Sequence, residues 1–135
     1  MLQLELYARD LQPELKVNYC RLLAVSVDDR ETTSALRQKI GANWPFLIDD
    51  QRHLIHELDI VDNTDAAHSP IPIPYTFILD SDRTIYKLYN GWWFVGRPTV
   101  EELRQDLRTL LVRRSDYAYN RDWDVSEESR KKAYL

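Results

Sequence analysis

The sequence is poor in several residues that commonly define a functional class. It has one cysteine, Cys20, in 135 residues, so an internal disulfide and a cysteine-rich metal knuckle are both excluded. It has three glycines, and they form no glycine-rich phosphate loop. No apolar run approaches the ~20 residues that span a bilayer. Glu5, Arg9 and Asp10 stand where a signal peptide needs an apolar stretch, so we expect a cytoplasmic protein without a membrane partner.

The sequence also lacks an excess of positive charge. Its formal net charge is −4 and its pI is near 5.3, which argues against a nucleic-acid partner because phosphate binding needs clustered Lys and Arg. Hydrophobic residues make up 44% and charged residues 30%, a composition typical of a globular protein. The length predicts one domain, over residues 1–112, followed by a polar C-terminal tail over residues 113–135.

Hydrophobic spacing predicts helices in the first half of the chain. The opening residues form an amphipathic helix that Pro13 kinks or restarts, with an apolar face made of Leu4, Ala8, Leu11 and Leu15. Asp28 or Asp29 caps a second helix, which ends at Gly41 and whose stripe is Thr32, Leu36, Lys39 and Ile40. Asp49 or Asp50 caps a third helix, whose inward residues are Leu54, Ile55 and Leu58.

Short apolar runs predict strands at Leu22–Val27 and Phe46–Ile48. The polar stretch Val61–His68 reads as an irregular loop. It leads into Pro70, Pro72 and Pro74, which hold the chain extended as it enters the strand Tyr75–Asp80. That strand reads as buried on both faces.

The predicted second half ends with a hairpin and a helix. Thr84–Asn90 alternates in the manner of the return arm of a β-hairpin. Thr99 and Glu102 form a capping box, and the helix they begin has a buried face made of Val100, Leu103, Leu107, Leu110 and Leu111.

Three segments carry a family resemblance: Leu22–Asp28, Trp44–Asp49 and Pro74–Asp80. In this order, and followed by a hairpin, they resemble the thioredoxin-fold redoxins of the alkyl hydroperoxide reductase and thiol-specific antioxidant group, over roughly residues 2–111. The resemblance implies an α/β fold with a thioredoxin-like mixed sheet flanked by helices. It also implies thiol peroxidase or thiol–disulfide exchange activity, with a thiol reductant as partner and no cofactor.

The resemblance also shows what this chain does not contain. In the family a strand ends in the reactive cysteine, which lies at the N-terminus of the first helix, where the helix dipole lowers a thiol pKa. Here the chain begins within that helix, truncated relative to the family, and carries no thiol there. The family's arginine on the strand after the proline would fall near Tyr86 or Lys87. We therefore expect the domain to be inactive in this form; either its start codon is assigned too far downstream or it is a degenerate domain used for binding.

The resemblance leaves three possible remnants of the redox site. Pro74 matches the family's cis proline, and Thr76 and Arg97 are expected to lie near it. Cys20 follows the first helix and would lie at the opposite edge of the sheet, where the helix C-terminus raises a thiol pKa. It reads as an inert, partly buried residue or as a redox-sensitive thiol.

The missing strand would lie between Leu22–Val27 and Tyr75–Asp80. Without it, each buried and unpaired backbone group costs about 1–3 kcal/mol. Direct pairing of the two strands, a segment of the C-terminal tail, or a strand from a second protomer would fill the gap. We therefore expect a homodimer or larger homo-oligomer.

Histidines and aromatic residues form the remaining groupings. His53 and His56 are three residues apart, a spacing that suits either a solvated helix face or, with a third ligand, a metal site, and we predict no metal. His68 is either a loop residue or a proton donor or acceptor near the proline run. The loop before Arg97 is predicted to lie close to Pro74; it packs internally, contacts a protein or lines a small-molecule pocket, and the binding candidates are Tyr75, Trp92, Trp93 and Phe94.

Overall fold

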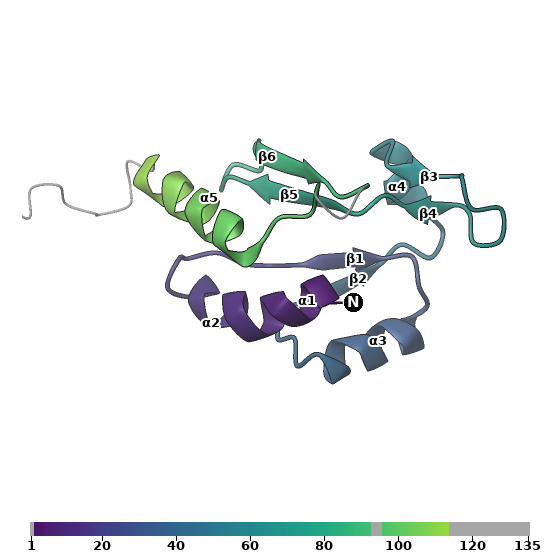
Figure 1. The fold of residues 1–135 in the computed structure, drawn as a ribbon, viewed down its shortest axis with the longest axis horizontal. Coiled ribbons are helices and arrows are strands. Elements are labelled where there is room, and N and C mark those ends of the chain that lie inside the picture. The colour runs from purple at the N-terminus through teal and green to yellow at the C-terminus, as the bar shows by residue number, and fades with distance from the viewer. Residues whose placement is uncertain (1, 93–95, 114–135) are drawn as a thin grey trace, which may run out of the picture.

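The structure is a computed structural model that describes residues 2–92 and 96–113. Its elements follow the predicted alternation of helices and short strands (Figure 1). In order they are α1 (Leu2–Leu6), η1 (Tyr7–Leu11), α2 (Gln12–Leu15), β1 (Ala24–Ser26), α3 (Arg30–Lys39), β2 (Phe46–Ile48), α4 (His53–Glu57), β3 (Val61–Asp62), β4 (Ile71–Pro72), β5 (Tyr75–Leu79), β6 (Ile85–Asn90) and α5 (Val100–Arg113).

The described strands pair as three two-stranded sheets. β1 and β2 run parallel, whereas β3 pairs with β4 and β5 with β6 in antiparallel fashion. The β5–β6 ladder places Thr76 opposite Tyr89 and has an irregularity between Ile78 and Leu79. In Figure 1, β1 and the first helical segment lie between α3 and the β5–β6 hairpin.

The first helical segment supplies the centre of the core. Of its predicted apolar face, Ala8, Leu11 and Leu15 are buried and Leu4 packs against them. The helix changes to a π-helical turn over Tyr7–Leu11 and restarts at Gln12, with Pro13 in the first turn, where a proline costs no hydrogen bond. The predicted restart at Pro13 is therefore confirmed. Across the core lie Ala42, Trp44, Ile78, Leu103 and Leu110.

The limits of α3 follow the sequence signals, but its buried face does not. The Asp29 carboxylate accepts the N–H of Thr32 at 2.8 Å, and Gly41, with φ of 68°, follows the helix. The predicted inward positions Thr32 and Lys39 are wrong, because both are exposed. The inward face begins one residue later, at Thr33, and continues through Leu36 and Ile40.

The first turn of the short helix α4 is served by the Asp49 carboxylate, as one of the two predicted alternatives, but the N-cap position itself is Arg52 and the helix buries less than predicted. Asp49 accepts the N–H groups of Leu54 and Ile55 at 3.2 and 3.1 Å. Ile55 alone is buried, while Leu54 and Leu58 are 37% and 43% exposed, so their predicted inward packing is wrong. A helix of five residues presents little more than one position to the rest of the protein.

The predicted loop over Val61–His68 contains a strand. Val61 pairs with Pro72 and Asp62 with Ile71, so the proline run forms one arm of a small antiparallel ladder. The Asp62 carboxylate accepts the N–H of Thr64 at 2.8 Å and helps to turn the connection. The polar composition of this segment concealed the pairing, because two residues are too few to show alternation.

β1 and β5 are less buried than predicted and do not pair with each other in the described part of the chain. In β5 only Ile78 is buried, and Leu79 is 50% exposed. In β1, Val25 is 40% exposed. The prediction that β5 is buried on both faces is therefore wrong, and direct pairing does not fill the place of the missing strand.

The helix α5 begins at the predicted capping box. Glu102 accepts the N–H of Thr99 at 2.7 Å, and the Thr99 hydroxyl accepts the N–H of Glu102 at 3.1 Å. Leu103 and Leu110 are buried as predicted, and the buried carboxylate Asp106 was not predicted. The described residues include no helix that is long and apolar enough to cross a bilayer.

Candidate functional site

Pro74, Gly91 and Arg97 meet in what we call the proline corner. The Gly91 N–H donates to the Pro74 carbonyl oxygen at 2.7 Å. A methyl group on Gly91 would run into that oxygen and would lie 2.9 Å from Cγ of Arg97. The corner is thus packed around a glycine, and Gly91 and Arg97, at the two ends of the aromatic loop, lie close to Pro74 as predicted.

A second glycine closes the base of the aromatic loop. A methyl group on Gly96 would overlap the carbonyl group of Asn90 and lie 3.4 Å from Cα of Gly91. Trp92 is the residue after Gly91. It donates its backbone N–H to Oδ1 of Asn90 at 3.0 Å, and its side chain is 42% exposed. The binding candidates Trp93 and Phe94 lie outside the described residues, so their roles stay predictions. Tyr75 is half-buried and stacks on Phe77, with ring centroids 5.7 Å apart.

The expected cis peptide at Pro74 is wrong. Among the described residues the cis bond joins Ser69 to Pro70. The chain reverses there, at the end of the loop after β3, and then runs extended through β4 into β5. The Ile73 N–H donates to the Ile60 carbonyl at 2.7 Å, which keeps this stretch aligned beside the end of α4.

Arg97 has an unusual environment within the proline corner. Its Nε is buried and has no hydrogen-bond partner among the described residues. Within the same residues, Arg97 forms no ion pair with the carboxylates at the start of α5, where Glu101 pairs with Arg104 and Glu102 with Thr99. Thr76 is half-buried on the β5 face that also carries Ile78.

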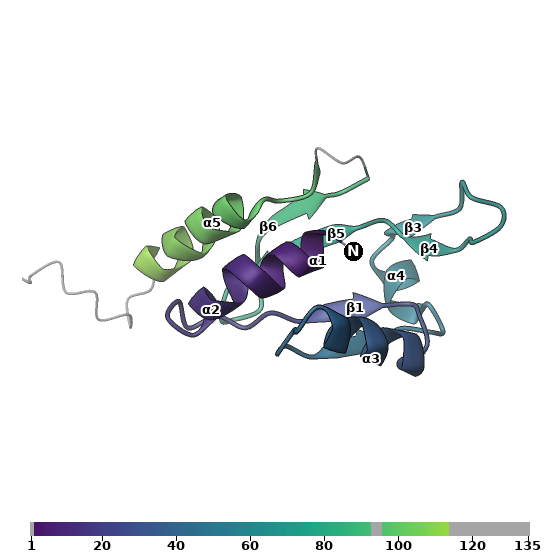
Figure 2. The ribbon, with the colours of Figure 1, turned by 60° about the horizontal axis from the view of Figure 1, so that its bottom comes forward.

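Tyr7, which the sequence did not single out, joins the first helix to the segment after the corner. Its side chain is 4% exposed, and its hydroxyl donates to the Pro98 carbonyl at 2.7 Å while accepting from Nε2 of Gln3 at 2.5 Å. Burial raises the pKa of this phenol. Figure 2 shows the first helical segment between α5 and α3. The helical spacing from Leu4 to Leu11 indicated a buried position 7, but nothing local indicated its partner.

Asp106 forms a second unpredicted polar cluster. It accepts the Tyr89 hydroxyl at 2.5 Å and Nζ of Lys87 at 3.1 Å, which joins α5 to β6. Burial, followed by the hydrogen bond to Asp106, raises the pKa of Tyr89, and hydrogen bonds to Tyr89 and Asp106 raise the pKa of Lys87. Tyr86 lies under the Arg113 guanidinium at 5.1 Å. The two positions where the family's arginine was expected, 86 and 87, are thus engaged with α5.

Cys20 lies beyond the other end of the first helical segment. It is half-buried between α2 and β1, and its Sγ donates to the Asn18 carbonyl at 3.0 Å. Burial raises the pKa of the thiol, so the reactive thiolate is disfavoured. From Gln3 to Leu15 the helix rises by roughly 18 Å, at 1.5 Å per residue. The structure therefore does not bring Cys20 to the end of the helix that faces the proline corner.

The histidines do not converge. His53 and His56 are both exposed on α4, and the described residues contain no group of three potential metal ligands. The exposed His68 places Nδ1 2.7 Å from Oδ2 of Asp65, and this hydrogen bond lowers the pKa of the Asp65 carboxyl. These contacts match the loop interpretation of His68.

A mixed α/β fold in which the first helix meets a proline-led hairpin is that of the thioredoxin-like redoxins. Residues 5–88 match the AhpC/TSA family, and the chain belongs to this family. The fold agrees with the two AhpC structures reported next.

Mycobacterium tuberculosis AhpC gives a TM-score of 0.65 at 22% identity, over 82% of this chain and 61% of that protein. Enterococcus faecalis AhpC gives 0.65 at 22% identity, over 80% of this chain and 65% of that protein. Peroxiredoxin 6 of Arenicola marina gives a TM-score of 0.62 at 22% identity, over 90% of this chain and 64% of that protein. The chain thus spans less than two thirds of each of these proteins. No curated protein sequence matches it significantly.

Proposed function

We propose that this chain is part of a peroxiredoxin-like thiol oxidoreductase whose peroxidatic cysteine is not among these 135 residues, and that the chain by itself does not reduce peroxide. The observation that carries the proposal is the position of Cys20, at the wrong end of the first helical segment and with a raised thiol pKa. The intact domain would reduce peroxides or disulfides through a cysteine facing the proline corner. A thiol reductant would then regenerate it.

The chemistry explains why the position matters. A thiolate attacks one peroxide oxygen, so an S–O bond forms as the O–O bond breaks, and the sulfur is oxidised to a sulfenic acid. The other oxygen leaves as hydroxide or alkoxide and takes up a proton to give water or an alcohol. The attacking group has to be the thiolate, which a helix N-terminus favours and an apolar, half-buried site disfavours. Cys20 lies in a half-buried site of this disfavouring kind, so its thiol is poorly suited to attack peroxide.

We predict that Cys20 alkylates slowly in the folded protein. Because its pKa is raised, the thiolate fraction at pH 7.5 lies below that of an ordinary cysteine, and the rate should rise as the pH increases beyond the usual thiol range. Iodoacetamide labelling followed by mass spectrometry from pH 6 to pH 10 measures this. The control is the same chain in urea, where the thiol is exposed. Faster labelling of the folded chain than of the unfolded chain at pH 7 would contradict the proposal.

A second candidate function is binding without catalysis. It is favoured by the exposure of Trp92 at 42% beside the exposed Pro74, because aromatic side chains that project at a rigid corner are common in protein contacts. In this alternative the proline corner and Tyr75 form a contact surface. Both proposals predict that the chain has no peroxidase turnover, and turnover through Cys20 would contradict both.

We also propose that the chain forms a homodimer in the cytoplasm, in which a second copy contributes to the edges of β1 and β5 that have no partner strand within residues 2–92 and 96–113. The exposed apolar side chains Val25 and Leu79 lie on these strands. Sedimentation should give twice the chain mass of 16.1 kDa. Val25→Lys should weaken the dimer, and Leu88→Lys on β6, where the side chain is 49% exposed, should not. A monomer at all accessible concentrations would contradict this proposal.

A further inference from the structure

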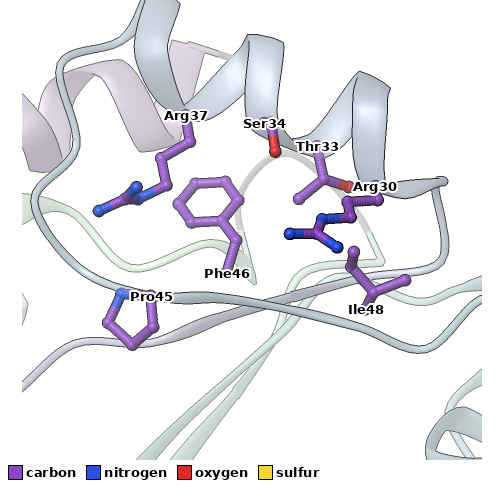
Figure 3. A pocket seen from close by; sticks show the side chains of 7 residues that line it. All are labelled: Arg30, Thr33, Ser34, Arg37, Pro45, Phe46 and Ile48. Carbon is purple, nitrogen blue, oxygen red and sulfur yellow. The ribbon is translucent and has the colours of Figure 1, made fainter.

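A shallow pocket of 340 Å³ lies between α3 and β2 and shares no residue with the proline corner (Figure 3). We propose that it binds a small aromatic oxyanion, such as an aryl phosphate. Its lining combines two arginines, two hydroxyl groups and an apolar floor, contributed by Arg30, Thr33, Ser34, Arg37, Pro45, Phe46 and Ile48.

The two arginines give the pocket a positive rim. Arg30 and Arg37 are seven residues apart, close to two helical turns, so both project from the same face of α3. Figure 3 shows their guanidinium groups on either side of the Phe46 ring. Nε of Arg37 donates to the Trp44 carbonyl at 2.9 Å, which fixes the side chain and leaves its two terminal nitrogens for a ligand. No carboxylate is among the residues that line the pocket.

Thr33 provides an independent indication of a polar ligand. It is 2% exposed, and its Oγ1 is buried without a hydrogen-bond partner in the described part of the chain. Burial of a hydroxyl without a hydrogen-bond partner lowers the stability of the folded protein, and protein structures normally avoid it. Figure 3 shows this hydroxyl on the pocket side of α3, turned toward the Arg30 side chain. The Thr33 hydroxyl and the Arg30 guanidinium are both hydrogen-bond donors, and a pair of such donors suits an oxyanion.

The floor of the pocket selects for an aromatic body. Phe46 is half-buried and is held by Trp44, with ring centroids 6.3 Å apart and planes 17° from parallel. Ile48 extends the apolar surface beside it. A volume of 340 Å³ is at the small end of ligand pockets, which matches one ring that carries one oxyanion group. Inorganic phosphate would use the rim alone, and a neutral aromatic molecule would use the floor alone.

The test is titration of the full chain with phenyl phosphate, followed by backbone NMR shifts. We expect saturable shifts at Thr33, Ser34 and Phe46, with inorganic phosphate and phenol each binding more weakly. Arg30→Gln should weaken phenyl phosphate binding by roughly tenfold, as expected for loss of a charge-assisted contact. Thr33→Val, which keeps the side-chain shape, should weaken it as well. Arg21→Gln, an exposed arginine outside the pocket, is the matched control and should bind normally.

Three results would overturn the proposal. The first is the absence of saturable shifts at the pocket residues. The second is an equal loss of affinity in Arg30→Gln and Arg21→Gln, which would show attraction by overall charge only. The third is unchanged affinity in Thr33→Val when the spectrum of that variant shows a folded protein.

Discussion

Replacing Gly91 by alanine is expected to lower the free energy of unfolding by about 2–4 kcal/mol. The added methyl group has no space, because the Pro74 carbonyl oxygen and Cγ of Arg97 already occupy it. The Pro74 oxygen belongs to the backbone and cannot rotate away. Relief of the overlap would move the aromatic loop from β5 and break the hydrogen bond from the Gly91 N–H to Pro74. Chemical denaturation monitored by tryptophan fluorescence and by circular dichroism measures the change.

Gly41 provides the matched control. It has φ of 68°, and a methyl group there would meet nothing within 4 Å. Gly41→Asn should therefore lower the free energy of unfolding by much less than Gly91→Ala does, since asparagine tolerates this backbone conformation. If the two variants were equally stable, the proline corner would not be packed as described. The expected difference comes from the neighbours of Gly91 and not from glycine flexibility.

Local signals in the sequence predicted the order of the elements well. The caps at Asp29 and Asp49, the capping box at Thr99 and the glycine after α3 each depend on residues within a few positions of one another. The apolar spacing of the first helix similarly placed Leu11 at the centre of the core. Such features can be predicted because their physical cause lies within one or two turns of chain.

The parts that failed depend on contacts between distant segments. The burial of β5 was inferred from its apolar residues, but burial needs neighbouring strands, and β5 has only β6 among the described residues. The Tyr7 hydroxyl meets Pro98, 91 residues away, and no local pattern indicates that pairing. The pairing of β3 with β4 was missed for a different reason, because two polar-flanked residues are too few to show alternation.

The candidate site was predicted only in part. The resemblance predicted the aromatic loop close to Pro74, and the contact from Gly91 shows that the start of the loop lies there. It also suggested a cis bond at Pro74, which is wrong. The roles of Thr76 and Arg97 stay predictions. The buried Nε of Arg97 could not be foreseen, because burial of one atom depends on the complete packing of the corner.

The largest functional effect that we expect is the absence of peroxidase chemistry in a chain that belongs to the AhpC/TSA family. In the proposed mechanism, peroxide is reduced by a thiolate at the helix end that faces the proline corner. The thiol of the single cysteine is instead half-buried, has a raised pKa and donates a hydrogen bond to the Asn18 carbonyl. Cys20→Ser should therefore leave peroxide consumption unchanged and should also leave the fold unchanged, because serine can keep this hydrogen bond.

The most direct test is hydrogen peroxide consumption by the purified chain, with dithiothreitol as reductant, compared with that of Cys20→Ser and with a sample that contains reductant alone. The account predicts the same rate in all three samples. Consumption by the unmodified chain above the reductant background, abolished in Cys20→Ser, would contradict it and would make Cys20 the reactive thiol.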